Sequence, residues 1–154
     1  MRRRFPAALR FLGSGSPDQQ TCSLSLNSPS QRAEWRSQFV VSAESLERWF
    51  TFVAEAESNV VAFAQVSSET RPQEFQALWV LPQRLHCGLG RALVQRAAAH
   101  AAARGQAALA IDSDPNAESF YLRCGARVVG QVTAPIEDSP NRVRPQLILS
   151  TSAT

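Results

Sequence analysis

One stretch decides the fold: Leu78-Trp79-Val80-Leu81-Pro82-Gln83-Arg84-Leu85-His86-Cys87-Gly88-Leu89-Gly90-Arg91-Ala92-Leu93. Its apolar first part is typical of a strand that ends at Pro82, and its last part begins an alanine-rich helix. The first turn of a helix carries backbone N–H groups without a partner in the helix, next to the positive end of the helix dipole. Gly88 and Gly90 stand at this turn, and glycine lets a bulky anion approach such groups closely. We therefore predict that the turn binds a ligand that carries phosphate.

Two other phosphate-binding loops share some of these features. A nucleoside-triphosphate loop needs a lysine, and the chain contains none. A dinucleotide-binding loop would read Gly88-Leu89-Gly90-Arg91-Ala92-Leu93, with leucine in place of the third glycine. Asp112 follows at a distance that suits a ribose-binding acid, so this alternative stays open. Against it, five residues separate Pro82 from Gly88, whereas a dinucleotide loop turns directly off its strand.

The stretch resembles the central motif of the GNAT superfamily of acyl-CoA-dependent N-acyltransferases, which is written Leu-x-Val-x-Pro-x-x-Arg/Gln-x-x-Gly-x-Gly/Ala. The positions in register are Leu78, Val80, Pro82, Gly88 and Gly90. Leu85 stands where the family prefers Arg or Gln. In the family, backbone N–H groups are the main ligands of the coenzyme A pyrophosphate at this turn, so the change of one side chain weakens the match only modestly.

A second stretch strengthens the resemblance. Residues 114–126 read Asp114-Pro115-Asn116-Ala117-Glu118-Ser119-Phe120-Tyr121-Leu122-Arg123-Cys124-Gly125-Ala126. They are similar to the later motif of the family, in which Asn and Ala lead into Phe/Leu-Tyr-x-x-x-Gly. Asn116 stands where one branch of the family writes Asp-Pro-Asn-Ala. The two motifs occur in the family's order, and the resemblance covers roughly residues 50–150.

The hydrophobic pattern predicts strands at residues 52–56, 60–66, 75–81, 107–111, 127–132 and 145–149. It predicts helices at residues 89–104 and 115–125, and a helix at 42–50 with Leu46, Trp49 and Phe50 on its apolar face. Trp35 and Phe39 are consistent with one face of an earlier helix. The resemblance implies an α/β fold: a single domain with a mixed, strongly bent sheet, in the order β-β-β-α-β-α-β-β.

The N-terminal part is less regular. We treat residues 1–30 as a poorly defined segment and residues 31–154 as the acetyltransferase domain. Phe5, Ala8, Leu9 and Leu12 fit one face of a helix, although the family places its first strand in this region. Residues 14–30 are rich in Ser, Pro, Gln and Gly and are typical of a loop.

The resemblance implies acetyl-CoA as the acyl donor. Its pyrophosphate would contact the N–H groups of residues 86–91, and its pantetheine arm would run along residues 78–80 like an added strand. In the family the thioester enters a gap between the strands predicted here at 75–81 and 107–111. The predicted donor-binding residues are Leu78, Trp79, Val80, His86, Cys87, Gly88, Leu89, Gly90, Arg91 and Asn116.

Tyr121 occupies the position at which the family carries the general acid that protonates the departing thiolate. The alternative for Tyr121 is the packing role of an ordinary helix tyrosine. Many relatives place a glutamate base on the strand before the proline, where this chain has Gln76 and Ala77. Glu74 and Asp112 are the remaining candidates. Asp112, at the end of a central strand, is the better placed, and a cap or turn role suits it equally well.

Composition excludes several function classes. The net charge of +3 is small and the arginines are scattered along the chain, so nucleic acid is not an expected partner. No apolar run approaches the ~20 residues that cross a bilayer, and no membrane association is expected. The three cysteines, Cys22, Cys87 and Cys124, cannot all pair within one chain and lack metal-ligand spacing. We therefore expect reduced thiols, a cytoplasmic protein and no metal.

These observations predict an N-acetyltransferase that moves an acetyl group from acetyl-CoA to a primary amine by direct attack in a ternary complex. The acceptor would be a small molecule or a peptide. The alternative is a non-catalytic acyl-CoA-binding or regulatory module on the same fold, because the N-terminal part is not recognised and the strand glutamate is missing. The identity of the acceptor and the formation of a homodimer stay open.

Overall fold

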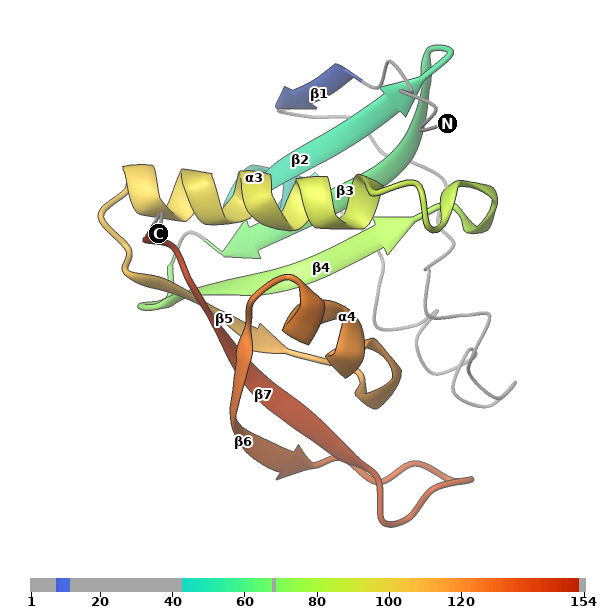
Figure 1. Cartoon of the computed structure of the whole chain (residues 1–154), viewed down its shortest axis with the longest axis vertical. Coiled ribbons are helices and arrows are strands. Elements are labelled where there is room, and N and C mark those ends of the chain that lie inside the picture. The colour runs from blue at the N-terminus through green and yellow to red at the C-terminus, as the bar shows by residue number, and fades with distance from the viewer. Residues whose placement is uncertain (1–7, 12–42, 68, 153–154) are drawn as a thin grey trace.

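A computed structural model describes residues 8–11, 43–67 and 69–152. These residues form one seven-stranded sheet in the order β1-β2-β3-β4-β5-β7-β6 (Figure 1). The elements are β1 (Ala8–Phe11), α2 (Ala43–Arg48), β2 (Trp49–Ala56), β3 (Asn59–Ser67), β4 (Gln73–Val80), η2 (Pro82–Arg84), α3 (Leu89–Ala103), β5 (Ala108–Asp112), η3 (Pro115–Ala117), α4 (Glu118–Arg123), β6 (Arg127–Thr133) and β7 (Val143–Ser150). From β2 onward, the predicted succession of strands and helices is confirmed.

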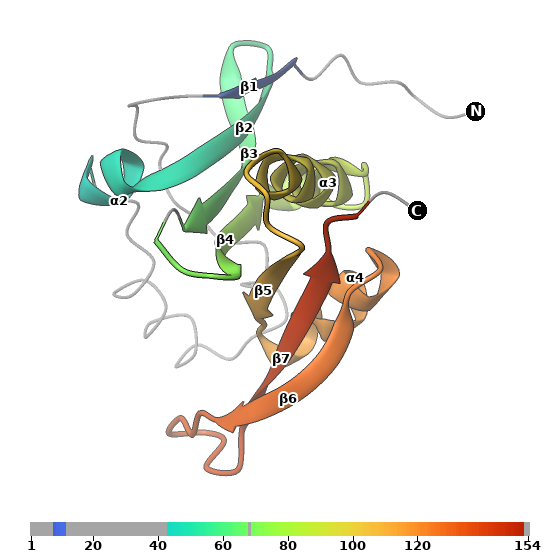
Figure 2. The same cartoon turned by 90° about the vertical axis from the view of Figure 1, so that its left-hand side faces the viewer.

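The sheet is mixed, as predicted. Antiparallel pairing joins β1 through β4 in series and joins β5 to β7 and β7 to β6, whereas β4 and β5 run parallel. A parallel pair needs a crossover connection, and α3 supplies it. α3 lies across β2, β3 and β4, and α4 lies on the same face in front of β5 and β7 (Figures 1 and 2).

α3 packs on the sheet through one side of the helix. Its buried residues, at helical spacing, are Leu93, Val94, Ala97 and Ala101. Alanine lets the helix approach the sheet closely, and the core continues into Leu109 and Ile111 of β5 and Leu147 and Leu149 of β7. The helix ends just before Gly105, which adopts a φ of 75°. The predicted helix at 89–104 is thus confirmed to within one residue.

The helix predicted at residues 42–50 is wrong in its second half. α2 ends at Arg48, and Trp49 and Phe50 are the first residues of β2, so Leu46, Trp49 and Phe50 do not form one helical stripe. The reason is non-local, because Trp49 lies opposite Ser67 in the antiparallel ladder with β3. Aromatic and β-branched residues suit such a ladder, and an isolated helix of this length is marginal.

In the N-terminal region the structure describes only residues 8–11, so the predictions can be compared with it only there. These residues form β1, which pairs with β2, so a strand and not a helix is present there. Residues 12–42, including Trp35 and Phe39, lie outside the described part of the chain.

β4 and β5 diverge after a short common ladder. Their pairing ends where Phe75 lies opposite Ile111, although β4 continues to Val80 beside β3. Gln76 is an extra residue at this point, because the register sets Gln65 opposite Ala77 and Val66 opposite Phe75. Such a β-bulge bends its strand and increases its twist. The two strands therefore open toward the end of the molecule at which α3 begins (Figure 1).

His100 on α3 makes the free energy of unfolding depend on pH. Its ring centroid lies 4.3 Å from that of Phe50 and 5.3 Å from that of Phe52. Burial, and after it the positive charges of Arg104 and Arg96, lower the pKa of His100 below its ordinary value of 6.5. The unfolded chain then binds the proton more readily than the folded chain. The free energy of unfolding must therefore fall as the pH drops through about 6.5 toward the lowered pKa.

We expect His100→Leu to flatten this dependence, because it removes the titrating group and retains apolar contact with the two rings. Urea unfolding between about pH 5 and about pH 8 measures it. His86, the other histidine of the chain, is exposed, and His86→Asn is the matched control that should keep the wild-type slope. An undiminished slope in His100→Leu would assign the effect to other groups.

Candidate functional site

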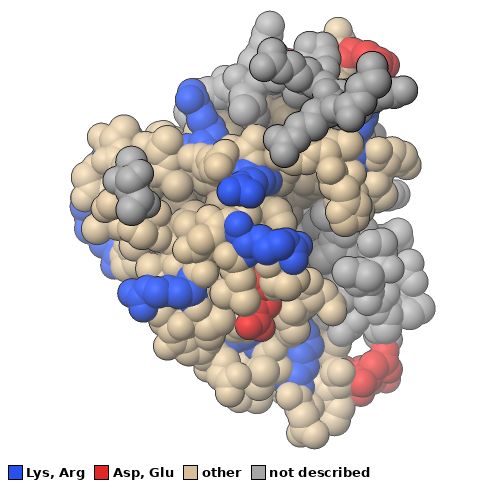
Figure 3. All heavy atoms as spheres, viewed as in Figure 1, with Lys and Arg blue, Asp and Glu red and all other residues tan. Residues whose placement is uncertain are grey.

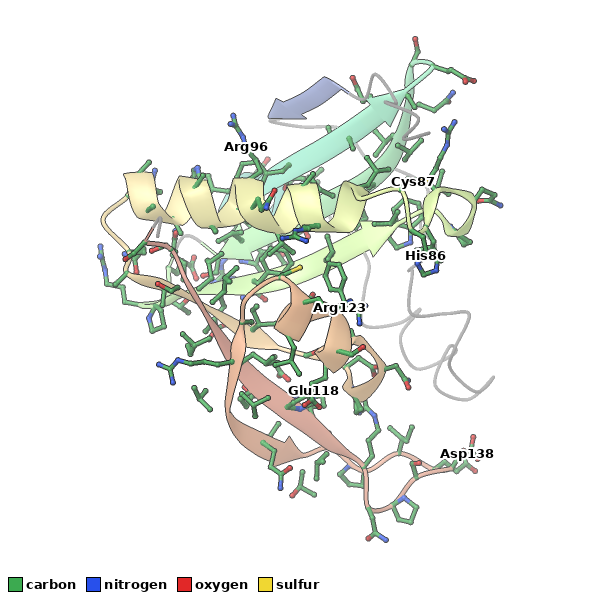
Figure 4. The ribbon with its side chains drawn as sticks, viewed as in Figure 1. His86, Cys87, Arg96, Glu118, Arg123 and Asp138 are labelled. Atoms are coloured by element: carbon green, nitrogen blue, oxygen red, sulfur yellow. The ribbon has the colours of Figure 1, made fainter. Side chains whose placement is uncertain are left out.

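The loop between β4 and α3, which carries His86 and Cys87 (Figure 4), leads to exposed helix amides. His86 adopts a φ of 60° and Gly88 a φ of 84°, both in the left-handed region. Gly88 is the N-cap of α3, and no side chain caps the helix there. Ala92 is the first residue whose N–H joins the helical ladder, and it donates to the Gly88 carbonyl at 3.0 Å. The N–H groups of residues 89–91 are therefore hydrogen-bond donors that an anion could use at the positive end of the helix.

The two glycines of the motif serve different purposes. A Cβ placed on Gly88 would meet no atom within 4 Å, so the space in front of the helix start is open. A Cβ on Gly90 would lie 3.2 Å from Cζ of Phe120. Gly90 thus lets α4 pack against the first turn of α3, while Gly88 supplies the left-handed backbone and leaves room for a ligand.

Residues 76–80 of β4 present a free strand edge beside this turn. Among the described residues they pair only with β3, because the ladder with β5 ends at Phe75. The side chains of Leu78 and Val80 belong to the core under α3. Trp79 points to the other face of the sheet, where its ring stacks on Phe63 at 5.7 Å between centroids. Trp79 can therefore contact a ligand in the gap through its backbone and not through its indole.

Tyr121 lies at the point where β4 and β5 part. Its ring stands edge-on to Phe75, at 6.1 Å between centroids, and edge-on to Phe120, at 5.1 Å. Phe75 is the last residue of β4 that pairs with β5, so the tyrosine ring lies beside the apex of the opening. Tyr121 is only 8% exposed and belongs to the apolar core. The first turn of α3 thus lies beside Val80, the free edge of β4 covers residues 76–80, and Tyr121 contacts Phe75 at the other end of this edge.

Residues 47–125 match a family model described as an acetyltransferase (GNAT) domain. The chain belongs to the GNAT acetyltransferase family. This assignment leaves no support for the dinucleotide-binding alternative. A search among curated proteins finds no match to the chain.

Solved structures of GNAT proteins share the fold. A GCN5-related N-acetyltransferase from Rhodopseudomonas palustris has a TM-score of 0.67 at 17% identity, over 94% of this chain and 95% of that chain. An aminoglycoside 6'-N-acetyltransferase complexed with coenzyme A has a TM-score of 0.65 at 16% identity, over 81% and 88%. The ribosomal-protein-S18-alanine N-acetyltransferase from Escherichia coli has a TM-score of 0.59 at 21% identity, over 80% and 78%. At these identities the likeness shows the fold alone.

Asp112 of this GNAT domain is already engaged by β7. Its Oδ1 accepts a hydrogen bond of 2.8 Å from Nε2 of Gln146, and its Oδ2 lies 2.7 Å from Nη2 of Arg144. The carboxylate is about two-fifths exposed. Glu74, the second candidate base, accepts a hydrogen bond of 3.1 Å from Nε2 of the bulged Gln76. The pairing of Asp112 could not be read from the sequence, because its partners come from a distant strand.

Two arginines lie near the contact between α3 and α4. Burial raises the pKa of the Cys124 thiol, and the positive charges of Arg91 and Arg123 act in the opposite direction. Arg91 is one of the predicted donor-binding residues. Arg123 is not among them, because the sequence does not show that α4 brings it close to α3. Basic side chains are spread over this face of the GNAT domain, and acidic ones are few on it (Figure 3). Both arginines are therefore available to an anionic ligand near the start of α3.

The start of α4 is tied to the hairpin of β6 and β7. Asp114 caps the turn at Pro115, accepting from the N–H of Asn116 at 2.9 Å. Its other oxygen lies 2.8 Å from Nη2 of Arg142, whose Nη1 donates to the carbonyl of Ala134 at 3.2 Å. The side chains of Asp114 and Arg142 are 10% and 9% exposed. This ion pair fixes the entry to the helix that carries Tyr121.

Arg142→Met is expected to lower the free energy of unfolding by about 2 kcal/mol, because it leaves the buried Asp114 carboxylate without its charged partner. Denaturant unfolding measures the change. Arg144→Met is the matched control: its ion pair with Asp112 is far more exposed, so its loss should cost less than about 1 kcal/mol. Equal costs for the two variants would show that burial does not set the strength of the Asp114 pair.

The described residues hold no group of three or more His, Cys, Asp or Glu side chains placed to bind a metal ion. None of the described helices is long and apolar enough to span a membrane. Cys87 is exposed on the loop between β4 and α3, and Cys124 is half-buried.

Proposed function

We propose that this GNAT protein is an N-acetyltransferase that moves the acetyl group of acetyl-CoA to a primary amine, by direct attack in a ternary complex. The observation that carries the proposal is the alignment of three features. Exposed amides begin α3, β4 has a free edge after residue 75, and Tyr121 lies at the apex of the gap. A diphosphate, an extended amide-bearing arm and a thioester need these features in this order.

The donor would bind mainly through backbone groups. Its pyrophosphate would accept hydrogen bonds from N–H groups within residues 86–91, with Arg91 nearby. Its pantetheine arm would pair with Leu78, Trp79 and Val80 as an added strand. Asn116, exposed in the turn before α4, completes the predicted contacts. A neighbour of the same fold is complexed with coenzyme A, which supports this class of donor.

The chemistry needs a neutral amine, a polarised carbonyl and a stabilised leaving group. A backbone N–H near Val80 would donate to the thioester oxygen as negative charge develops there. The phenol of Tyr121 would protonate the thiolate, which leaves readily because a thiol has a pKa near about 8.5. These groups act on the bond that breaks, and the acceptor supplies the nitrogen that forms the new amide.

Asp112 is the candidate base of this proposal. Both of its oxygens already contact β7 side chains, Gln146 and Arg144, so a water molecule between Asp112 and the amine is the natural route for the proton. A carboxylate has more acceptor sites than its two present partners use. The acceptor would be a small molecule or a peptide. The names of two GNAT neighbours give an aminoglycoside and an alanine of a ribosomal protein as acceptors, which supports both classes.

Calorimetric titration with acetyl-CoA, run beside a thiol-release assay over a panel of amines, tests the function. We expect saturable binding and release of coenzyme A with at least one primary amine. Binding without release on any amine would support the alternative, a non-catalytic acyl-CoA-binding module. Absence of binding would overturn both.

A further inference from the structure

A polar pocket of about 300 Å³ lies at the C-terminal end of α3, remote from the loop between β4 and α3. Its lining comes from the start of β4 and the C-terminal end of α3 and comprises Thr70, Arg71, Gln73, Ala103, Arg104 and Gln106. The length of α3 separates it by roughly 20 Å from the amides that would hold the donor. Figure 1 shows the loop before α3 and the turn after it at opposite ends of the helix.

Two arginines give the pocket positive charge. Arg71 and Arg104 both line it, and neither forms an ion pair with a described carboxylate. Cζ of Arg104 lies 4.5 Å from the ring centroid of Phe50, and this cation–π contact holds the guanidinium in place. Glu69, the acid closest to Arg71 in sequence, is bound to Arg48 at 2.7 and 2.8 Å.

Gln73 adds a buried polar group to the lining. It is 3% exposed, and its Oε1 is buried with no hydrogen-bond partner among the described residues. Phe75, the next residue on the same side of β4, belongs to the apolar core, so packing alone would favour an apolar residue at 73. An unpaired buried carbonyl oxygen is costly unless a hydrogen-bond donor completes it, and a hydroxyl group on the organic part of a ligand, or a water molecule, supplies such a donor.

The C-terminal end of α3 disfavours anion binding in the pocket, but only weakly. The C-terminal end of α3 carries the negative pole of the helix dipole, which is equivalent to about half an elementary charge. Its exposed carbonyls are partly neutralised, because Ala101 and Ala102 accept from the N–H groups of residues 104–106. Two full positive charges at Arg71 and Arg104 outweigh this term.

We propose that this pocket is a second anion site, separate from the donor site, which binds a small phosphomonoester. Its volume is at the lower end of that of small-molecule sites and exceeds what inorganic phosphate fills. The planar fork of arginine matches the oxygens of phosphate and carboxylate alike. A phosphomonoester carries close to two negative charges near neutral pH, which matches two arginines, whereas a carboxylate carries one.

Amide chemical shifts in a titration with inorganic phosphate, and then with glycerol phosphate, locate and test the site in the full chain. We expect saturable shifts at the amides of residues 70, 71, 73 and 103–106, with glycerol phosphate the tighter ligand and acetate the weakest. Arg71→Gln and Arg104→Gln should each lower the affinity for glycerol phosphate by about tenfold or more, because each removes a charge-assisted contact. Arg96→Gln removes the same charge from the same helix outside the lining and should change the affinity by less than about twofold.

Titrations of the same variants with coenzyme A distinguish the two sites. Arg71→Gln and Arg104→Gln should bind coenzyme A with the affinity of the wild type. Gln73→Met should lower the affinity for glycerol phosphate without lowering the unfolding temperature of the protein. Shifts confined to residues 86–91 would overturn the proposal. An effect of Arg96→Gln as large as that of Arg104→Gln, or unchanged affinity in the variants at 71, 73 and 104, would overturn it as well.

Discussion

Replacing Tyr121 by phenylalanine is expected to lower kcat by about 100-fold, the usual loss when a general acid is removed. The dissociation constant of acetyl-CoA should stay nearly unchanged. Phenylalanine keeps the edge-on contacts with Phe75 and Phe120 and removes only the hydroxyl group, so the gap between β4 and β5 keeps its shape. Steady-state rates of coenzyme A release, with calorimetry for the donor, separate the two quantities.

The leaving group provides an internal control for this variant. A thioester of a more acidic thiol needs less protonation, so the difference between wild type and Tyr121→Phe should shrink with such a donor. Loss of packing would instead lower the rate with both donors alike and would lower the unfolding temperature. Equal kcat in the variant and the wild type would remove Tyr121 from the mechanism.

Gly88→Val is expected to weaken acetyl-CoA binding by at least about 100-fold, because loss of two charge-assisted hydrogen bonds is worth roughly 3 kcal/mol. The open space beside Gly88 would receive the valine side chain in front of the helix amides. A β-branched residue also resists the φ of 84° that the N-cap adopts. Both effects displace the groups that would hold the pyrophosphate.

Gly105→Val is the matched control for backbone strain. Gly105 has a φ of 75°, has open space at its Cβ position and lies at the other end of α3. The two variants should lose similar stability, and only Gly88→Val should lose donor affinity, measured by calorimetry. Undiminished affinity in Gly88→Val would place the pyrophosphate elsewhere.

The features that could be predicted depend on neighbours in the sequence. A proline that ends a strand, a glycine at a left-handed N-cap and an alanine-rich amphipathic run together specify β4, the loop that follows it and α3. The bounds of β4 and α3 agree with the structure to within one or two residues. The cap at Asp114 belongs to the same class, since its acceptor and donor are two residues apart. Local geometry leaves few alternatives for such patterns.

The features that could not be predicted depend on pairing between distant segments. Trp49 and Phe50 follow a helical spacing with Leu46 but join β2 because β3 offers a ladder. The bulge at Gln76 depends on the register of β3 against β4, and Asp112 meets Arg144 and Gln146 across more than thirty residues. A pattern that is read along one segment contains no information on such a register.

By itself, the sequence determined the family, the turn with free amides and the helix that follows it, because these depend on short-range backbone chemistry. Only the tertiary structure decided that β4 leaves β5 at Phe75, that Tyr121 borders that point and that Arg71 and Arg104 line one pocket. Each of these depends on how far two segments remain paired, and that balance is set by contacts across the whole sheet.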